Sequence, residues 1–323
     1  MVWKAFRYAA VVSCAAVLLS AAAWSAPELK VSGFVQARYT ADEAPGTAAT
    51  FSVRRARLTV DAALTPQTAA RVQLDASGTP AILDAYCVLS PRDTNATIRL
   101  GQFKLPIAYD IIEPCSKLLE RELSEAWTRL VPKNRDAGVY VQVKGQSRAP
   151  SWDLAIVNGN GLNKADNNQH KDVLVREVIP LNAGSLALAY YTGKFTTGAP
   201  PVTTVRTRLT AGADLNFDPV GVRAEYVRGR DLGADVSGGY LRLSGKVGKK
   251  GDIAFAKYDL YDENTDVPDT TFRRLTIGYV QKFDAQTRLT ALYQIKDVDP
   301  GYSGYAANDG NLLMLEAQME FGG

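Results

Sequence analysis

The sequence predicts an all-β fold, a transmembrane antiparallel β-barrel of about sixteen strands with a long third outer loop that folds inward. From about residue 29 to residue 321, short runs alternate apolar and polar residues, as strands with two different faces do. The connections between these runs alternate short and long, which is the layout of an outer-membrane barrel. The last run shows both faces: Leu313, Leu315, Ala317, Met319 and Phe321 oppose Leu312, Met314, Glu316, Gln318 and Glu320.

The composition excludes one class of membrane protein. The chain has 323 residues, of which 46% are hydrophobic and 22% are charged, as in many soluble proteins. No apolar run reaches the roughly 20 residues that a membrane-spanning helix needs, which excludes a helical membrane protein. A barrel remains compatible with these values, because its polar lumen dilutes the apolar signal.

Residues 1–26 have the layout of a secretory signal peptide. Lys4 and Arg7 make a basic start, residues 9–23 form an apolar run too short to span a bilayer, and small residues follow. We expect cleavage to leave one barrel domain, residues 27–323, in the bacterial outer membrane. Cleavage lowers Lys+Arg from 37 to 35 against 34 acidic residues, which leaves a net charge of +1. Any charge preference must therefore come from where the charges lie.

The predicted strands follow one another along the whole mature chain. They lie near 29–40, 50–64, 69–76, 82–89, 96–103, 137–144, 151–158, 172–180, 185–195, 206–217, 219–230, 237–247, 251–261, 271–283, 287–297 and 311–321. Short connections with turn-forming residues lie at 65–68, 91–93, 181–184, 218–219, 249–251 and 284–286. Longer ones lie at 42–49, 159–171, 196–205, 262–270 and 299–310. An even strand number places the short turns and both termini on the periplasmic side.

The connection at 104–136 differs from the others in length. A structureless segment of about thirty residues is uncommon inside a compact domain and is usually functional. It contains a stretch with helical spacing at 116–129, in which Leu119, Leu123 and Trp127 recur. We expect this third outer loop to fold into the barrel and narrow the channel; an external cap or a partner-contact loop is the alternative.

Alternation also assigns the basic residues to a face. A charged side chain that faces lipid at mid-bilayer costs about 2–4 kcal/mol, so arginines opposite apolar strand positions belong in the lumen. Rings of such residues favour anions in a pore. Inward carboxylates at Asp61, Asp75, Asp84, Glu225, Asp259, Glu316 and Glu320 leave a non-selective pore as the alternative. The predicted lumenal arginines are Arg55, Arg57, Arg99, Arg206, Arg208, Arg242 and Arg274.

Several segments resemble the phosphate-selective porin O and P family. They are FSVRRARL at 51–58, RVQLD at 71–75, LDAY at 83–86, IRLGQFKLP at 98–106, RDAGV at 135–139, and NGNGLN at 158–163 followed by KD at 171–172. The resemblance is specific over about 50–180. It implies a homotrimeric channel of sixteen-stranded barrels for phosphate-like anions, with a constricting third loop. It also implies that Arg55 or Arg57 is a channel arginine and that Lys104 opens the constriction loop.

Other functions fit the sequence less well. A barrel enzyme needs a Ser/His/acid constellation near its outer rim, and the sole histidine, His170, has no evident serine partner. An adhesin barrel in solution needs polar outer positions, which the strands lack. One histidine cannot make a metal site, and we expect no cofactor and no nucleic acid partner. The spacing of Cys87 and Cys115 leaves open whether they pair.

Overall fold

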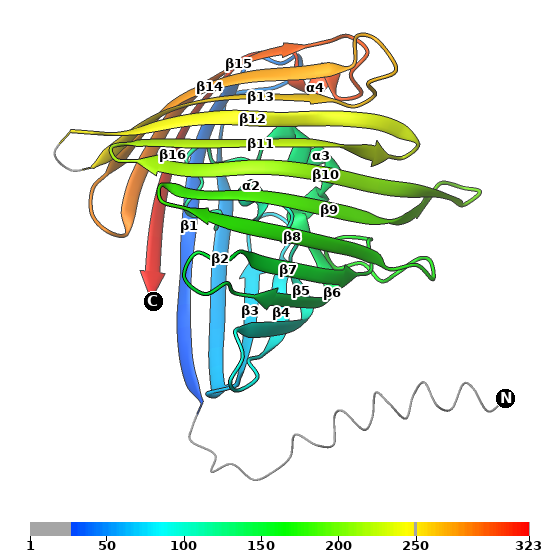
Figure 1. The fold of residues 1–323 in the computed structure, drawn as a ribbon. Helices are drawn as coiled ribbons and strands as arrows, with labels where there is room; N and C mark the ends of the chain where they lie inside the picture. Colours follow the sequence, from blue (N-terminus) through cyan, green and yellow to red (C-terminus); the bar gives the residue numbers. More distant parts are fainter. Residues whose placement is uncertain (1–26, 249–250, 323) are drawn as a thin grey trace.

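The computed structural model describes residues 27–248 and 251–322 and shows a closed antiparallel barrel (Figure 1). The predicted signal peptide at 1–26 lies outside the described residues. Each strand pairs with its sequence neighbours, and β1 pairs with β16 to close the barrel. The first eight strands are β1 (Glu28–Asp42), β2 (Thr50–Thr65), β3 (Thr68–Asp75), β4 (Ala81–Leu89), β5 (Ala96–Lys104), β6 (Arg135–Val143), β7 (Ser151–Val157) and β8 (Asp172–Leu181). The others are β9 (Gly184–Thr197), β10 (Val202–Phe217), β11 (Val220–Asp231), β12 (Ala234–Val247), β13 (Asp252–Asp262), β14 (Thr271–Lys282), β15 (Thr287–Val298) and β16 (Leu312–Gly322).

The two faces of the strands separate as the alternation predicts. On β10, Arg206 and Arg208 are buried inside the barrel, whereas Leu209 between Arg208 and Thr210 is exposed on the outside. On β16, Glu316 and Gln318 are buried, while Met319 is 60% exposed. The outer surface is therefore apolar and the inner surface polar, which confirms the predicted fold class.

A β-bulge in β2 changes the face of one residue. Gln36 on β1 pairs with Arg55, but the next residue, Ala37, pairs with Val53, so Arg54 is the extra residue. A bulge leaves its extra residue outside the regular alternation. Arg54 therefore turns toward the same carboxylate, Glu122, as its neighbour Arg55.

One end of the barrel carries mostly long connections, called here the loop end, and the other carries short ones, called the turn end. Two loop-end connections are shorter than the sequence suggests. β9 and β10 extend through most of the predicted 196–205 loop and leave only residues 198–201. β11 and β12 are joined by Leu232 and Gly233, both with positive φ (49° and 91°), a geometry that suits a two-residue hairpin turn.

The short helices lie in the loop-end connections. Those between β5 and β6 are α2 (Tyr109–Ile112), α3 (Glu125–Leu130) and the 3-10 turn η1 (Pro132–Asn134); α4 (Tyr305–Asn308) lies between β15 and β16. No helix among the described residues is long and apolar enough to cross a membrane. Cys87 and Cys115 are both free thiols, so the two do not pair. His170 is exposed in the connection between β7 and β8.

Candidate functional site: the lumen and the loop that crosses it

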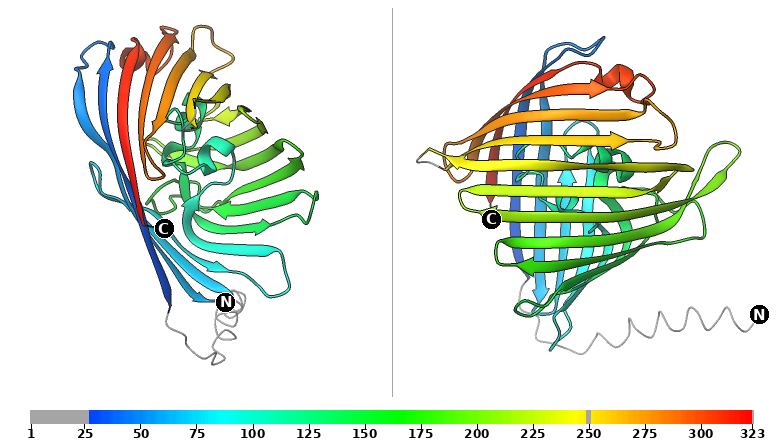
Figure 2. Two further views of the ribbon diagram at one scale, coloured as in Figure 1. Left: turned by 90° about the vertical axis from the view of Figure 1, so that its left-hand side faces the viewer. Right: turned by 45° about the horizontal axis from the view of Figure 1, so that its top comes forward.

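The connection between β5 and β6, residues 105–134, lies inside the barrel. In the left view of Figure 2, the teal segment with α2 and α3 lies between opposing walls. It starts and ends on the β5–β6 wall, and its middle reaches β1, β2 and β16 on another part of the ring. We call it the lumen loop. Its side chains and backbone are held by wall residues of many strands.

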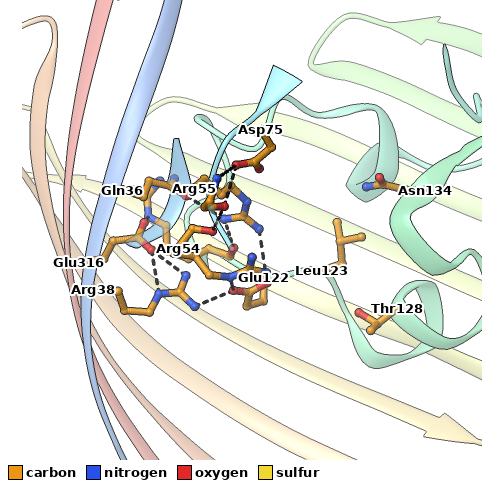
Figure 3. Close-up of polar contacts among 12 residues, drawn as sticks. Gln36, Arg38, Arg54, Arg55, Asp75, Glu122, Leu123, Thr128, Asn134 and Glu316 are labelled. Carbon is orange, nitrogen blue, oxygen red and sulfur yellow. Dashed lines mark hydrogen bonds and ion pairs between the residues drawn. The ribbon is translucent and has the colours of Figure 1, made fainter. Parts of the chain in front are cut away.

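Glu122 joins the lumen loop to three arginines of β1 and β2 (Figure 3). Its Oε1 accepts hydrogen bonds of 2.7 Å from Arg38 Nη1 and 2.7 Å from Arg54 Nε. Its Oε2 accepts one of 2.8 Å from Arg54 Nη2, and Arg55 Nη2 lies 3.4 Å away. Arg38 also binds Glu316 of β16. One carboxylate of the loop thus neutralises part of a basic wall.

The two residues before Glu122 bind different walls. Glu120 accepts a 2.6 Å hydrogen bond from Lys257 Nζ of β13 and one of 3.2 Å from Arg242 Nη1 of β12. Arg121 is fully buried and donates to Thr290 of β15 and Gln318 of β16, with Glu316 3.3 Å from its Nε. Three consecutive side chains therefore bind three sectors of the ring.

This arrangement replaces most of the helix that the sequence predicts over 116–129. Only α3, Glu125–Leu130, is helical in that stretch. Arg121 has a φ of 68°, which interrupts a right-handed helix. Charge pairing with the wall has overridden the local helical preference.

A buried carboxylate of the wall holds the start of the lumen loop. Glu225 of β11 accepts hydrogen bonds from the backbone N–H groups of Tyr109 and Asp110, and from Trp127 Nε1 of α3 and the Tyr240 hydroxyl of β12. It thereby satisfies two N–H groups at the start of α2. Apolar side chains of the loop then pack on the wall: Ile107, Ile111, Trp127 and Leu130 belong to one buried cluster with Val227, Tyr240, Tyr261 and Phe272.

Burial and charge pull the pKa of Glu120 in opposite directions. Burial alone would raise the pKa of this carboxyl, but the nearby cations Lys257 and Arg242 outweigh it and hold the pKa at about 2. Glu120 is therefore ionised throughout the neutral range and forms a lasting ionic contact between loop and wall.

Four of the eight predicted lumenal cations take part in holding the loop. Arg55 donates to the Arg121 carbonyl at 3.1 Å, Arg242 binds Glu120, and Arg274 donates to the Leu123 carbonyl and binds Asp259. Lys104, at the end of β5, donates a 2.6 Å hydrogen bond to the carbonyl of Glu113. Arg57 instead binds Asp75 at 2.9 Å on its own wall. All five therefore have hydrogen-bond or ion-pair partners inside the barrel.

A second group of cations surrounds a cavity between the lumen loop and the turn end, which we call the inner cavity. It has a volume of about 260 Å³ and lies against β3 to β8. Arg99 has no carboxylate within ion-pair distance among the described residues; its guanidinium stacks on Tyr140 at 4.8 Å and Tyr86 at 5.5 Å. The charged lining is Arg71, Arg99, Lys104, Arg176, Asp84 and Asp153, four cations against two carboxylates.

Arg176 is a lumenal residue that sequence reasoning did not single out. Its Nη1 donates to Asp153 at 3.0 Å, and its side chain stacks on Tyr109 of the lumen loop at 4.9 Å. Its Nε and Nη2 are buried without a hydrogen-bond partner in the described structure. The signal was present, since Arg176 lies between outward Val175 and Glu177 on a predicted strand, but no motif marked it.

Arg206 and Arg208 lie in a separate cavity on the loop-end side of the lumen loop, which we call the outer cavity. Arg206 stacks on Phe195 at 4.4 Å and binds Asp172 at 3.2 Å. Arg208 stacks on Tyr191 at 4.8 Å, with Asp231 3.5 Å from its Nη2. The predicted site residues thus divide into loop anchors, inner-cavity residues and outer-cavity residues.

Comparison with known proteins places the fold among bacterial porins. The sequence matches no protein-family model and no curated protein. One solved structure of similar fold is the outer membrane protein OmpT of Vibrio cholerae in a trimer form. It has a TM-score of 0.68 at 12% sequence identity, and the match covers 92% of this chain and 100% of that protein's chain. An anion-selective porin from Comamonas acidovorans has a TM-score of 0.65 at 15% identity, with the same coverage. The outer membrane channel DcaP of Acinetobacter baumannii has a TM-score of 0.66 at 10% identity and covers 91% of this chain and 97% of its own. At these identities the similarity shows a shared barrel fold.

Proposed function

We propose that this chain is a passive outer-membrane porin for small anions, phosphate-like anions among them, and that it performs no enzymatic reaction. The observation that carries the proposal is the inner cavity, where, among the residues that the structure describes, Arg99 has no carboxylate within ion-pair distance and Arg176 has unpartnered donors. Guanidinium groups with free N–H donors bind phosphate and carboxylate oxygens. Several moderate sites along a lumen let an anion enter and still leave.

The architecture supports a channel in a membrane. The outer face of the barrel is apolar, as a lipid-facing surface must be, and closure leaves no unpaired strand edge. The lumen loop is positioned to narrow the passage, and its wall contacts keep it inside the barrel. The solved structures of similar fold include proteins titled as porins and channels, one of them anion-selective. We extend the proposal to a homotrimer, since one such structure is titled as a trimer form.

A general, non-selective porin is the second candidate, because many lumenal arginines are paired. Arg57 with Asp75, Arg71 with Asp61 and Arg135 with Asp84 carry little net charge. The two candidates differ in whether the inner cavity's excess cations act on a passing ion.

Reversal potentials across a planar bilayer in a KCl gradient test the proposal. We expect the purified barrel to favour chloride over potassium, and Arg99→Gln and Arg176→Gln to lower that preference. Arg228→Gln is the matched control, since Arg228 lies on the exposed outer face of β11. Preference for potassium, equal permeability, or a shift as large for Arg228→Gln would contradict anion selectivity.

A further inference from the structure

The outer cavity differs in chemistry from the inner one. It has a volume of about 140 Å³ and lies under the connection between β7 and β8. The apolar lining is Leu105, Leu130, Val131, Leu162, Tyr191 and Phe195, and two of its rings, Phe195 and Tyr191, contact arginines of the cavity. The charged lining has five cations, Lys133, Arg135, Lys164, Arg206 and Arg208, and one carboxylate, Asp136. Three of these cations also have a carboxylate outside the lining: Arg135 has Asp84, Arg206 has Asp172, and Arg208 has Asp231.

Two buried arginines leave donors unused in this cavity. Arg208 is 1% exposed, and its Nε and Nη2 have no hydrogen-bond partner among the described residues, although Asp231 lies 3.5 Å from its Nη2. Arg206 is 8% exposed, and its Nε is likewise unpartnered, although its Nη2 reaches the Gly159 carbonyl and Asp172. A buried donor without a partner costs free energy, which a bound anion would recover.

The rings beside these arginines fix them in place. Arg206 lies over Phe195 and Arg208 over Tyr191, so both guanidinium planes are held by stacking. The carboxylate of Asp136 accepts hydrogen bonds from the backbone N–H groups of Ala137 and Gly161, so its charge is already partly satisfied. Lys133 and Lys164 are exposed at the cavity and have no carboxylate within ion-pair distance in the described structure. The cavity therefore has the charge and the free donors to bind a negatively charged group.

Size and lining indicate what carries that negative group. An apolar cavity of about 150 Å³ in another protein binds benzene, so about 140 Å³ suits one ring. A bare phosphate would contact the arginines but leave the leucine, valine and phenylalanine side chains facing water. A molecule with one ring and one carboxylate would contact both the apolar and the charged lining. Asn160 Oδ1, which is buried and unpartnered, can also accept a hydrogen bond from a ring hydroxyl.

We propose that the outer cavity is a capture site for monocarboxylates that carry one apolar ring. Arg206 and Arg208 bind the carboxylate, and the apolar lining residues contact the ring. This inference rests on the proposed function, because it makes the site the first binding step of an anion channel. It names a substrate class different from the phosphate that the sequence resemblance implies.

Calorimetric titration of the folded, detergent-solubilised barrel tests the proposal. Benzoate, acetate and inorganic phosphate are titrated at one pH and one ionic strength. We expect benzoate to bind at least about tenfold more tightly than acetate, because burying a ring adds more than the 1.4 kcal/mol that equals tenfold. We expect it to bind more tightly than phosphate as well. Benzoate binding no tighter than that of acetate, or phosphate binding tighter than benzoate, would overturn the proposal.

Variants separate the contribution of the charged lining to binding from that of the apolar lining. Arg208→Gln should weaken both benzoate and acetate by about tenfold or more, since it removes charged hydrogen bonds. Phe195→Ala and Leu162→Ser should weaken benzoate while acetate binding stays the same, and these two remain informative if Arg208→Gln fails to fold. Arg228→Gln on the outer face is the control and should change neither. A benzoate-to-acetate ratio that persists in Phe195→Ala and Leu162→Ser contradicts a ring site.

The bilayer experiment keeps this inference distinct from the proposed function. Tight benzoate binding together with no chloride preference would refute the anion channel and leave the capture site standing. Chloride preference without benzoate discrimination would refute the capture site and leave the channel standing.

Discussion

Glu120 and Lys257 form a buried ion pair, 2.6 Å from carboxylate to ammonium, that ties the middle of the lumen loop to β13. Both side chains are almost fully buried, at 3% and 1% exposure. Asp110 of α2 lies 3.5 Å from the same ammonium, and Arg242 shares the Glu120 carboxylate. The loop is therefore held by a small network of charges inside the barrel. Removing one member leaves the others buried and unbalanced.

Glu120→Gln should lower the free energy of unfolding by about 3 kcal/mol, because it leaves the Lys257 ammonium without its nearest carboxylate. Urea unfolding of the folded barrel measures the change. A cycle with Lys257→Gln and the double variant isolates the pair, and we expect a coupling energy of at least about 1 kcal/mol. Additive single effects would show that the contact contributes nothing beyond burial.

Acid should loosen the lumen loop between about pH 4.5 and pH 2. The pKa of Glu120 falls from its ordinary 4.5 to about 2 in the folded barrel, because Lys257 and Arg242 outweigh its burial. A lowered folded-state pKa gives stability that is complete above pH 4.5 and is lost as pH falls toward 2. Proteolysis of the loop by an acid-active protease reports its release. In Glu120→Gln, the rate of loop proteolysis should change less between pH 4.5 and pH 2. If that variant shows the same pH profile as the unsubstituted barrel, another group causes the acid-induced release.

The strands and their faces could be predicted from the sequence because alternation is local. Each residue's face follows from its neighbours in the chain, and alternation places Arg206, Arg208 and Arg242 on the face that is buried in the barrel. Alternation cannot place Arg54, because a bulge shifts the register there, and a bulge depends on the pairing with β1.

The lumen loop was predictable in position but not in conformation. Its length indicates a special role, whereas its helical spacing predicts a helix over 116–129, of which only the part in α3 is helical. The conformation depends on contacts with residues more than a hundred positions away, such as Glu120 with Lys257. The division of the arginines into paired and unpaired groups has the same cause, since partners such as Asp75 for Arg57 come from another strand.

Cys115 should react faster with anionic than with cationic thiol reagents. Burial would raise the pKa of its thiol, but Lys104 and Arg57 outweigh burial and lower the pKa to about 6. The same cations attract a negative reagent, so we expect at least about a tenfold rate ratio at neutral pH. A sulfonate-bearing and an ammonium-bearing methanethiosulfonate measure it in a Cys87→Ala background, since Cys87 is exposed. Lys104→Gln should reduce the ratio, and equal rates in the unsubstituted loop would contradict a basic surrounding.

Gly193→Ala should destabilise the barrel near the outer cavity by about 1–3 kcal/mol, as overpacking does. A Cβ at Gly193 would lie 1.8 Å from Asp172 Oδ1, and Asp172 is fully buried. That carboxylate accepts a 3.0 Å hydrogen bond from the Lys194 N–H and binds Arg206, so its displacement frees a lumenal arginine. Gly245→Ala on β12 is the matched control, because its added Cβ would meet nothing within 4 Å. Urea midpoints of the two variants give the comparison, and equal midpoints would show that Asp172 can move aside without cost.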